Sequence, residues 1–204
     1  MRDLRPHEVE RAAAMLAQAF IGRPFTGLLG DDPAARLESS RVMFAGLARY
    51  GLAYGAVHAI GCIEGVAIGL APQYVEMTEE RLAAVGLADG SSVVGDAAWK
   101  RILAYDIVAA RLHEQSISGP HWYLSVIGVA PEVQGRGLAG ALLSHMYERL
   151  DGEHLPAYLD TNVSENVAFY QRRGFRVVAQ AVEPASGILI RGMLRAPGPA
   201  GRNG

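Results

Sequence analysis

One stretch constrains the fold of this chain more than any other feature. It joins a predicted strand at Leu124–Val129, a five-residue spacer, and a glycine turn that opens a predicted helix, Gly135-Arg136-Gly137-Leu138-Ala139-Gly140. Such a turn leaves several backbone N–H groups without partners and sets the positive end of the helix dipole beside them. The stretch therefore predicts a phosphate-binding site. The alternative is a glycine turn that only lets the helix pack closely on the strand.

The chain around this stretch has the composition of a globular protein. Of its 204 residues, 50% are hydrophobic and 20% are charged, which excludes a wholly disordered or fibrous protein. We expect one domain over residues 1–195. Residues 196–204 are rich in glycine and proline, and we expect them to form a disordered tail.

Charge and cysteine content narrow the class of partner and the location. The net charge is −2 without a block of basic residues, so we expect neither a nucleic acid nor a membrane as partner. The single cysteine, Cys62, excludes an internal disulfide, and we expect it to be a small buried residue. Because residues 1–10 are too charged for a signal peptide, the predicted location is the cytoplasm. The six histidines lack metal-ligand spacing, so we expect no metal.

Hydrophobic periodicity predicts alternating helices and strands, an α/β fold. A helical insertion, residues 72–119, separates an upstream helix–helix–hairpin unit from the strand before the glycine turn. Helices are predicted at residues 6–20, 32–50, 78–87 and 96–115, from 137 onward, and at 165–172; strands are predicted at 53–60, 65–71, 121–129, 156–160, 175–182 and 187–194.

Two kinds of phosphate site fit the glycine turn. Gly135, Gly137 and Gly140 match the dinucleotide pattern G-x-G-x-x-G, and Asp160 lies twenty residues further on, where a ribose-binding acid is expected. However, a dinucleotide fold turns directly after the strand, whereas five residues intervene here. Only 44 residues follow Asp160, which leaves no room downstream for a second half of the fold.

The second kind of site rests on resemblance. The segment from Val126 to Ala139 resembles the acetyl-CoA-binding motif of the Gcn5-related N-acetyltransferases (GNAT), a strand followed by Q-x-x-G-x-G/A at a helix start. The segment from Asn166 to Phe175 resembles the second motif of that family, a short helix ending in Y-x-x-x-G-F. Two motifs in the order of the family are more specific than either one alone.

This resemblance implies a mixed, splayed central sheet flanked by helices, with acetyl-CoA in the cleft between the strands at 122–129 and 156–160. The backbone of Ile127, Gly128 and Val129 would pair with the pantetheine arm. The segment Gln134, Gly135, Arg136, Gly137, Leu138, Ala139 and Gly140 would hold the pyrophosphate. Asn166 would either bond the cofactor or only cap its helix.

The resemblance also implies a reaction, the transfer of an acetyl group to a primary amine by direct attack. Tyr170 would assist the departing thiolate; the alternative is a half-buried core tyrosine. No residue is an obvious base, although Asp160 and Glu76 are candidates by type, and Tyr158 and Ser125 could position a water.

The acceptor is expected to be a small molecule, because the insertion supplies Tyr74, Trp99 and Tyr105 for an apolar or aromatic pocket. A peptide N-terminus or lysine is the alternative acceptor, and a non-catalytic acyl-CoA-binding regulatory module is the alternative function. The sequence is compatible with a homodimer but does not establish the oligomeric state.

Overall fold

In the computed structural model, which describes residues 1–87 and 89–198, seven strands form one sheet in the order β1-β2-β3-β4-β5-β7-β6. All neighbouring strands are antiparallel except β4 and β5, which are parallel. The strands are β1 (Arg2–Asp3), β2 (Gly55–Ile60), β3 (Gly65–Leu70), β4 (Trp122–Val129), β5 (Ala157–Thr161), β6 (Arg176–Val182) and β7 (Leu189–Arg195). This mixed strand order confirms the predicted fold class and excludes the parallel sheet of a dinucleotide-binding fold.

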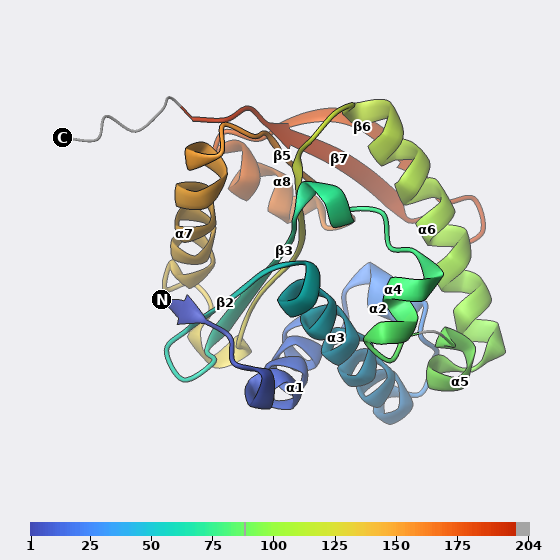
Figure 1. Cartoon of the computed structure of the whole chain (residues 1–204). Coiled ribbons are helices and arrows are strands. Elements are labelled where there is room, and N and C mark those ends of the chain that lie inside the picture. Colours follow the sequence, from blue (N-terminus) through green and yellow to red (C-terminus); the bar gives the residue numbers. More distant parts are fainter. Residues whose placement is uncertain (88, 199–204) are drawn as a thin grey trace.

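Helices cover both faces of the sheet (Figure 1). On one face, α1 and α3 pack on β2, β3 and β4, while α6 packs on β5, β6 and β7. On the opposite face, α7 and α8 pack around β4 and β5. The helices are α1 (Val9–Phe20), α2 (Pro24–Gly27), α3 (Pro33–Tyr54), α4 (Glu79–Ala84), α5 (Gly90–Val94), α6 (Asp96–Ser116), α7 (Leu138–Gly152) and α8 (Ser164–Gln171), with 3-10 turns at η1 (Pro6–Glu8), η2 (Pro72–Tyr74) and η3 (Pro131–Val133).

Two local expectations are wrong. Helix α3 continues past Gly51 to Tyr54. A Cβ atom at position 51 would lie 2.6 Å from Ile68 Cγ2 and 2.7 Å from Val57 Cγ2, so this glycine allows close packing of the helix on the sheet and does not end it. Cys62 is exposed because it lies on the outside of the turn between β2 and β3.

The end of the described chain is tied to α7. Arg195 at the end of β7 forms an ion pair of 2.7 Å with Asp151, and the backbone N–H of Gly198 donates to the same carboxylate at 2.7 Å. Residues 199–204 of the predicted tail lie outside the described residues. Within residues 1–87 and 89–198, no helix combines the length and apolarity needed to cross a membrane.

Candidate active site

The sheet opens between β4 and β5. These parallel strands pair only at Trp122 with Ala157 and at Tyr123 with Tyr158. Two residues beyond Tyr123, β4 carries a β-bulge, because Ser125 and Val126 together oppose the single residue Ile68 on β3. A bulge bends its strand and increases its twist. The bulge therefore turns the second half of β4 away from β5, at the place where the cleft is expected.

The bulge also decides which backbone groups face this opening. The Ala130 N–H donates to the Glu64 carbonyl on the β3 side at 2.8 Å. Because antiparallel backbone groups alternate in direction, those of Gly128 point to β3 as well, whereas those of Ile127 and Val129 point to the opening. The expectation that all three residues offer their backbone to a ligand arm therefore does not fit this register at Gly128. A Cβ at Gly128 would lie 2.5 Å from Leu16 Cδ2, so Gly128 instead allows α1 to approach β4.

The glycine turn is open on its outer side. Gly135 and Gly137 have φ angles of 78° and 82°, and a Cβ atom at either position would meet no atom within 4 Å. Close packing therefore does not explain these two glycines, whereas a left-handed backbone does. The first amide of α7 to find a carbonyl is that of Ala141, which donates to Gly137 at 3.0 Å. Within the described residues, the N–H groups of 135–140 have no acceptor.

Side chains fix the approach to this turn. The Gln134 amide donates to the Val129 carbonyl at 3.0 Å, so it holds the end of β4 and occupies one of the carbonyl groups that face the opening. Arg136 is exposed and donates to the Glu132 carbonyl at 3.4 Å. Leu138 and Ala139 pack on the core between α7 and the sheet.

Gly140 has a different role from the two turn glycines. A Cβ atom there would lie 2.5 Å from Nη2 of Arg173. That guanidinium lies 3.7 Å from the centre of the Phe169 ring and donates to the Phe169 carbonyl at 2.9 Å. Gly140 therefore leaves room for a fixed cation beside the first turn of α7.

Tyr170 lies at the end of α8, on the α7 side of the sheet. Its half-buried ring makes edge contacts with Phe169 and Phe175, at centroid distances of 5.1 and 5.8 Å. Burial, followed by the neighbouring Tyr147 and Asp160, raises the pKa of Tyr170. The hydroxyl therefore stays protonated near neutral pH and is available as a hydrogen-bond donor.

Asn166 is not the cap of α8. Val163 holds the cap position, and the Asn166 N–H donates to the Val163 carbonyl at 3.1 Å. The half-buried Asn166 side chain makes no hydrogen bond among the described residues. A second asparagine that the sequence reading did not single out, Asn162, donates to the hydroxyl of Tyr105 on α6 at 3.0 Å.

Asp160 and Tyr123 meet on the α6 side of the opening. The Tyr123 hydroxyl donates to Asp160 Oδ2 at 2.7 Å. Asp160 lies two residues beyond Tyr158, the last residue of β5 that pairs with β4, so its carboxylate faces the region where the strands have separated. Burial raises the pKa of Asp160, and the Tyr123 hydrogen bond partly opposes that rise. The sequence predicts Asp160 as one of two candidate bases, but no sequence motif indicates Tyr123 as its hydrogen-bond partner.

The other candidate base lies elsewhere. The exposed Glu76 lies near α3 and α4, where its carbonyl faces Tyr50 and Arg81. The buried Tyr158 hydroxyl has no hydrogen-bond partner within the described chain.

The aromatic residues of the insertion do not form one pocket. Tyr105 packs beside β5 and its ring contacts Phe25 at 5.0 Å. Trp99 packs over Gly90 of α5. Tyr74 contacts Tyr54 at 5.1 Å, on the other side of α3.

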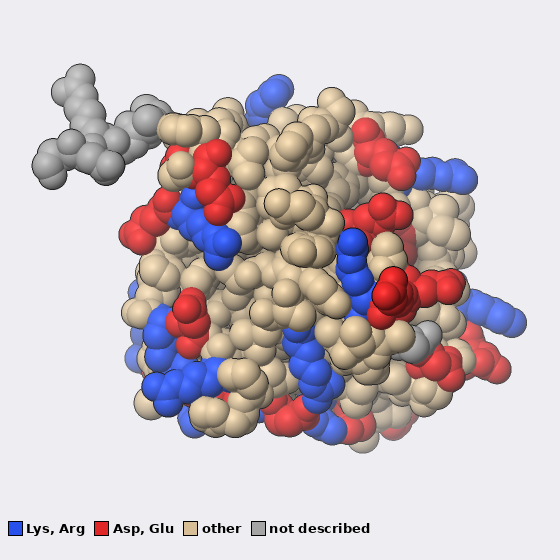
Figure 2. All heavy atoms as spheres, viewed as in Figure 1, with Lys and Arg blue, Asp and Glu red and all other residues tan. Residues whose placement is uncertain are grey.

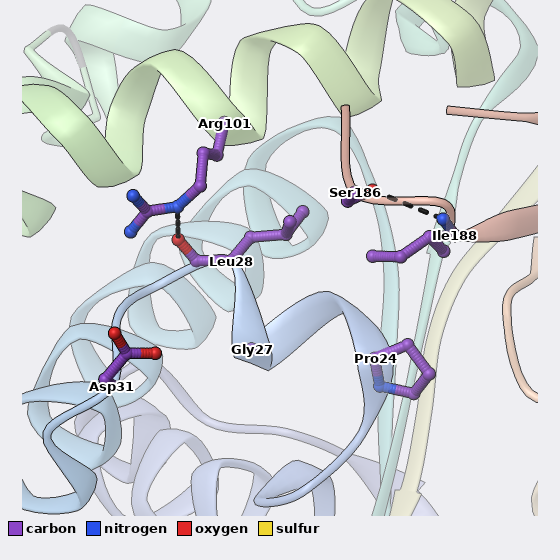
Figure 3. Close-up of a pocket in the computed structure, with 7 residues that line it drawn as sticks. All are labelled: Pro24, Gly27, Leu28, Asp31, Arg101, Ser186 and Ile188. Atoms are coloured by element: carbon purple, nitrogen blue, oxygen red, sulfur yellow. Dashed lines mark hydrogen bonds between the residues drawn. The ribbon is translucent and has the colours of Figure 1, made fainter. Parts of the chain in front are cut away.

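Two shallow hollows lie on the surface of the described residues. The first, about 380 Å³, lies between α2, α6 and the β6–β7 turn and is lined by Pro24, Gly27, Leu28, Asp31, Arg101, Ser186 and Ile188 (Figure 3). Figure 3 shows Arg101 reaching from α6 to the Leu28 carbonyl, a hydrogen bond of 2.8 Å, with the Asp31 carboxylate nearby. The second, about 320 Å³, includes Gln18, Arg23, Pro131 and Gln134 and lies between the end of α1 and the approach to the glycine turn. No three His, Cys, Asp or Glu side chains of the described residues gather as metal ligands.

Comparison with solved structures identifies proteins that share this fold. Solved structures with the same fold include a Corynebacterium glutamicum protein described as histone acetyltransferase HPA2 and related acetyltransferase, at 23% identity over 97% of this chain and 95% of that one, with a TM-score of 0.69. They also include the Drosophila melanogaster polyamine N-acetyltransferase, at 18% identity over 96% and 98%, with a TM-score of 0.60. Arylalkylamine N-acetyltransferase 2 from Aedes aegypti matches at 14% identity over 97% and 98%, with a TM-score of 0.59.

A comparison with family sequence profiles matches residues 60–175, more than half of the chain, to one profile. That region holds both motifs, the bulge of β4, the glycine turn and Tyr170. The chain belongs to the Acetyltransferase (GNAT) family.

Proposed function

We propose that the protein transfers an acetyl group from acetyl-CoA to the primary amine of a small molecule, in a ternary complex without a covalent enzyme intermediate. The observation that carries the proposal is the pairing of the open glycine turn with the splay between β4 and β5. The unpartnered N–H groups of residues 135–140 suit a pyrophosphate, and the positive end of the α7 dipole adds to the attraction.

The two ends of the donor would be held by different elements. The backbone groups of Ile127 and the N–H of Val129, which face the opening, suit an extended pantetheine arm, which would add to β4 as a short strand. Gln134 keeps the end of β4 in place, and Arg136 adds a cation at the rim of the turn. Asn166 at the start of α8 is the proposed side-chain contact from the second motif. When bound, acetyl-CoA supplies the activated acetyl group.

Tyr170 is the proposed donor to the departing sulfur. Its protonated hydroxyl suits a hydrogen bond that strengthens as negative charge develops there. Full proton transfer is less favourable, because the reference pKa of a thiol is about 8.5, below the value of about 10 for a tyrosine. The burial that raises the pKa of Tyr170 widens this difference.

A small acceptor is supported by the size and lining of the hollow in Figure 3. About 380 Å³ is within the range of small-molecule sites, and Asp31 offers an acidic group for a cationic amine. The Drosophila and Aedes proteins, which share the fold, are named for polyamine and arylalkylamine acceptors. On the face shown in Figure 2, acidic and basic side chains intermix without a continuous patch of one sign.

The test is release of free CoA thiol from acetyl-CoA with four acceptors: 2-phenylethylamine, agmatine, a peptide with a free N-terminus, and the same peptide with an acetylated N-terminus and one lysine. Release with the small amines alone is the expected result. Release with the peptides alone would replace the proposal by peptide acetylation. CoA binding without release for any acceptor would indicate a binding module.

A further inference from the structure

We propose that Asp160 accepts the proton of the acceptor ammonium, with Tyr123 as its positioning residue. This inference rests on the proposed function and assigns the base that the sequence left open. It follows from the place of the carboxylate in the splay and from its partners.

The first step is position. Asp160 follows the last paired residue of β5 and lies on the α6 side of the sheet, whereas Tyr170 packs on the α7 side. Helix α8, which carries Tyr170, packs on β5 and β6, so both side chains belong to elements on the β5 side of the opening. A carboxylate and a hydroxyl on opposite sides of a reacting thioester are suited to accept a proton from the amine and to assist the sulfur.

Second, the Asp160 carboxylate has few hydrogen-bond partners. An ionised carboxylate can accept about four hydrogen bonds, but Asp160 accepts only one from the described residues, that of Tyr123. No Lys, Arg or His side chain of residues 1–87 and 89–198 forms an ion pair with it. A half-buried carboxylate without a cation favours binding of a positive group. An ammonium ion fits this requirement.

The third step is the surroundings of the carboxylate. Tyr123 contacts it from β4, and Tyr158 lies two residues earlier on the same face of β5. The charge of Asp160 also contributes to the pKa shifts of Tyr105 and Asp106 on α6 and of Tyr170 on α8. All four tyrosines are neutral near pH 7 because burial, with Asp160 as a further cause, raises their pKa values. The remaining acidic neighbour is Asp106, whose pKa is raised to about 7 by burial and then by Asp160, so it carries only part of a negative charge at neutral pH.

The fourth step is rigidity. The His113 ring stacks on Tyr158 at 4.2 Å and on Tyr123 at 5.4 Å between centroids. His121 Nδ1 donates to the Gly119 carbonyl at 2.7 Å, and its Nε2 shares a hydrogen bond of 2.7 Å with His113 Nε2. Burial and, to a smaller extent, His121 lower the pKa of His113 to about 4. His113 is therefore uncharged near neutral pH, and its ring holds the rings of Tyr123 and Tyr158 in place.

The proposed step balances as follows. One N–H bond of the ammonium breaks and an O–H bond forms on Asp160, which later releases that proton to solvent. The nitrogen lone pair forms the C–N bond of the amide while the C–S bond breaks and its electrons go to sulfur. A second nitrogen proton ends on the sulfur. The products are the amide, the free thiol and one proton in solution.

The test compares two acceptors of nearly equal shape, 2-phenylethylamine, an ammonium at pH 7, and O-benzylhydroxylamine, which is already neutral there. We expect Asp160→Asn to lower kcat/KM about 100-fold or more with the first acceptor, since general base catalysis contributes about 10²- to 10⁴-fold. The loss with the neutral acceptor should stay below about tenfold. Asp96→Asn, which changes an exposed carboxyl in the first turn of α6, is the control and should leave the ratio of the two acceptors unchanged.

Tyr123→Phe tests the positioning role, because it keeps the stacked ring and removes the hydrogen bond that stabilises the carboxylate. The acid limb of the kcat/KM profile should move to higher pH. An unmoved limb overturns the role of Tyr123.

A second readout does not depend on activity. The pKa of Asp160 is raised in the folded protein, so the fold binds that proton more tightly than the unfolded chain and loses stability as pH rises above the ordinary carboxyl value of about 3.9. Asp160→Asn removes that loss. In urea unfolding, the stability of the variant relative to wild type should therefore increase between pH 4 and pH 7.

The outcomes separate this inference from the proposed function. Equal losses with both acceptors, or no loss with either, in an active enzyme overturn the role of Asp160 alone. A wild-type protein that acetylates no amine overturns the proposed function and this role together. If the stability difference between the variant and wild type does not change with pH, Asp160 is not a carboxylate with few partners and a raised pKa.

Discussion

The two turn glycines act through backbone conformation and through the space that they leave. At Gly137, φ is 82° and a Cβ atom would meet nothing within 4 Å. Asparagine tolerates this left-handed conformation better than other side chains do. We expect Gly137→Asn to fold with a stability loss of about 1 kcal/mol or less but to weaken CoA binding at least tenfold, because the added side chain occupies the approach to the open N–H groups.

Gly86→Asn is the matched control for this change, since Gly86 also has a φ of 81° and open space but lies after α4. Calorimetric titration with CoA, together with urea unfolding, measures both quantities. Unchanged CoA affinity in a folded Gly137→Asn protein would contradict the phosphate site.

Tyr170 makes its proposed contribution in the transition state. Tyr170→Phe keeps the ring contacts with Phe169 and Phe175 and removes one donor, so we expect kcat to fall about 100-fold with little change in acetyl-CoA affinity. The loss should shrink with an acyl donor whose thiol is more acidic, because a better leaving group needs less assistance. Steady-state kinetics with both donors tests this; an equal loss with each donor would indicate a structural tyrosine.

At the scale of elements, α3 shows packing overriding a local stop signal. Gly51 costs helix propensity, yet α3 passes through it because the helix lies against Val57 and Ile68. Gly51→Ala should therefore lower the free energy of unfolding by about 1–3 kcal/mol through overpacking. At Gly152, near the end of α7 with open space around it, the same change should raise stability by up to about 1 kcal/mol. Urea unfolding of both variants measures these free energies. If Gly51→Ala stabilises the protein, the sheet can move to make room for the added methyl group.

The contrast between local sequence signals and packing against distant segments also explains what the sequence could predict. Helix α1 and strands β2 to β5 follow from periodicity, because the core selects their apolar faces. Gly135 and Gly137 were recognisable as a turn because φ above zero is a local property. The β4 bulge at Ser125 was not, since it appears only when β3 sets the register. Of the partners, His113 lies on α6, Tyr123 on β4 and His121 in the loop between them. No local pattern aligns their side chains.

At the scale of the molecule, the two halves of the sheet meet weakly. One half holds β1 to β4 with α1 and α3, and the other holds β5 to β7 with α6 and α8. Within the described residues their strands pair at two positions only, between β4 and β5, although the apolar core on the α7 side spans both halves. The glycine turn and β4 belong to the first half, whereas Asp160 and Tyr170 belong to the second. A ligand that contacts both therefore connects parts that share few hydrogen bonds, and its binding should stabilise the whole fold.

This arrangement predicts the thermal response of the protein. At about 100 times its Kd, a ligand that binds only the folded state contributes about 2.7 kcal/mol, and for a chain of this size each kcal/mol raises Tm by about 2–4 °C. We therefore expect CoA and acetyl-CoA to raise Tm by about 5–10 °C. NADH should not, because the mixed sheet lacks the parallel half that a dinucleotide requires. Differential scanning calorimetry with wild type and Gly137→Asn at one ligand concentration measures the effect, and the shift should fall to about half or less in the variant, because a tenfold weaker Kd leaves about 1.4 kcal/mol. A shift with NADH and none with CoA would return the glycine turn and Asp160 to the dinucleotide interpretation.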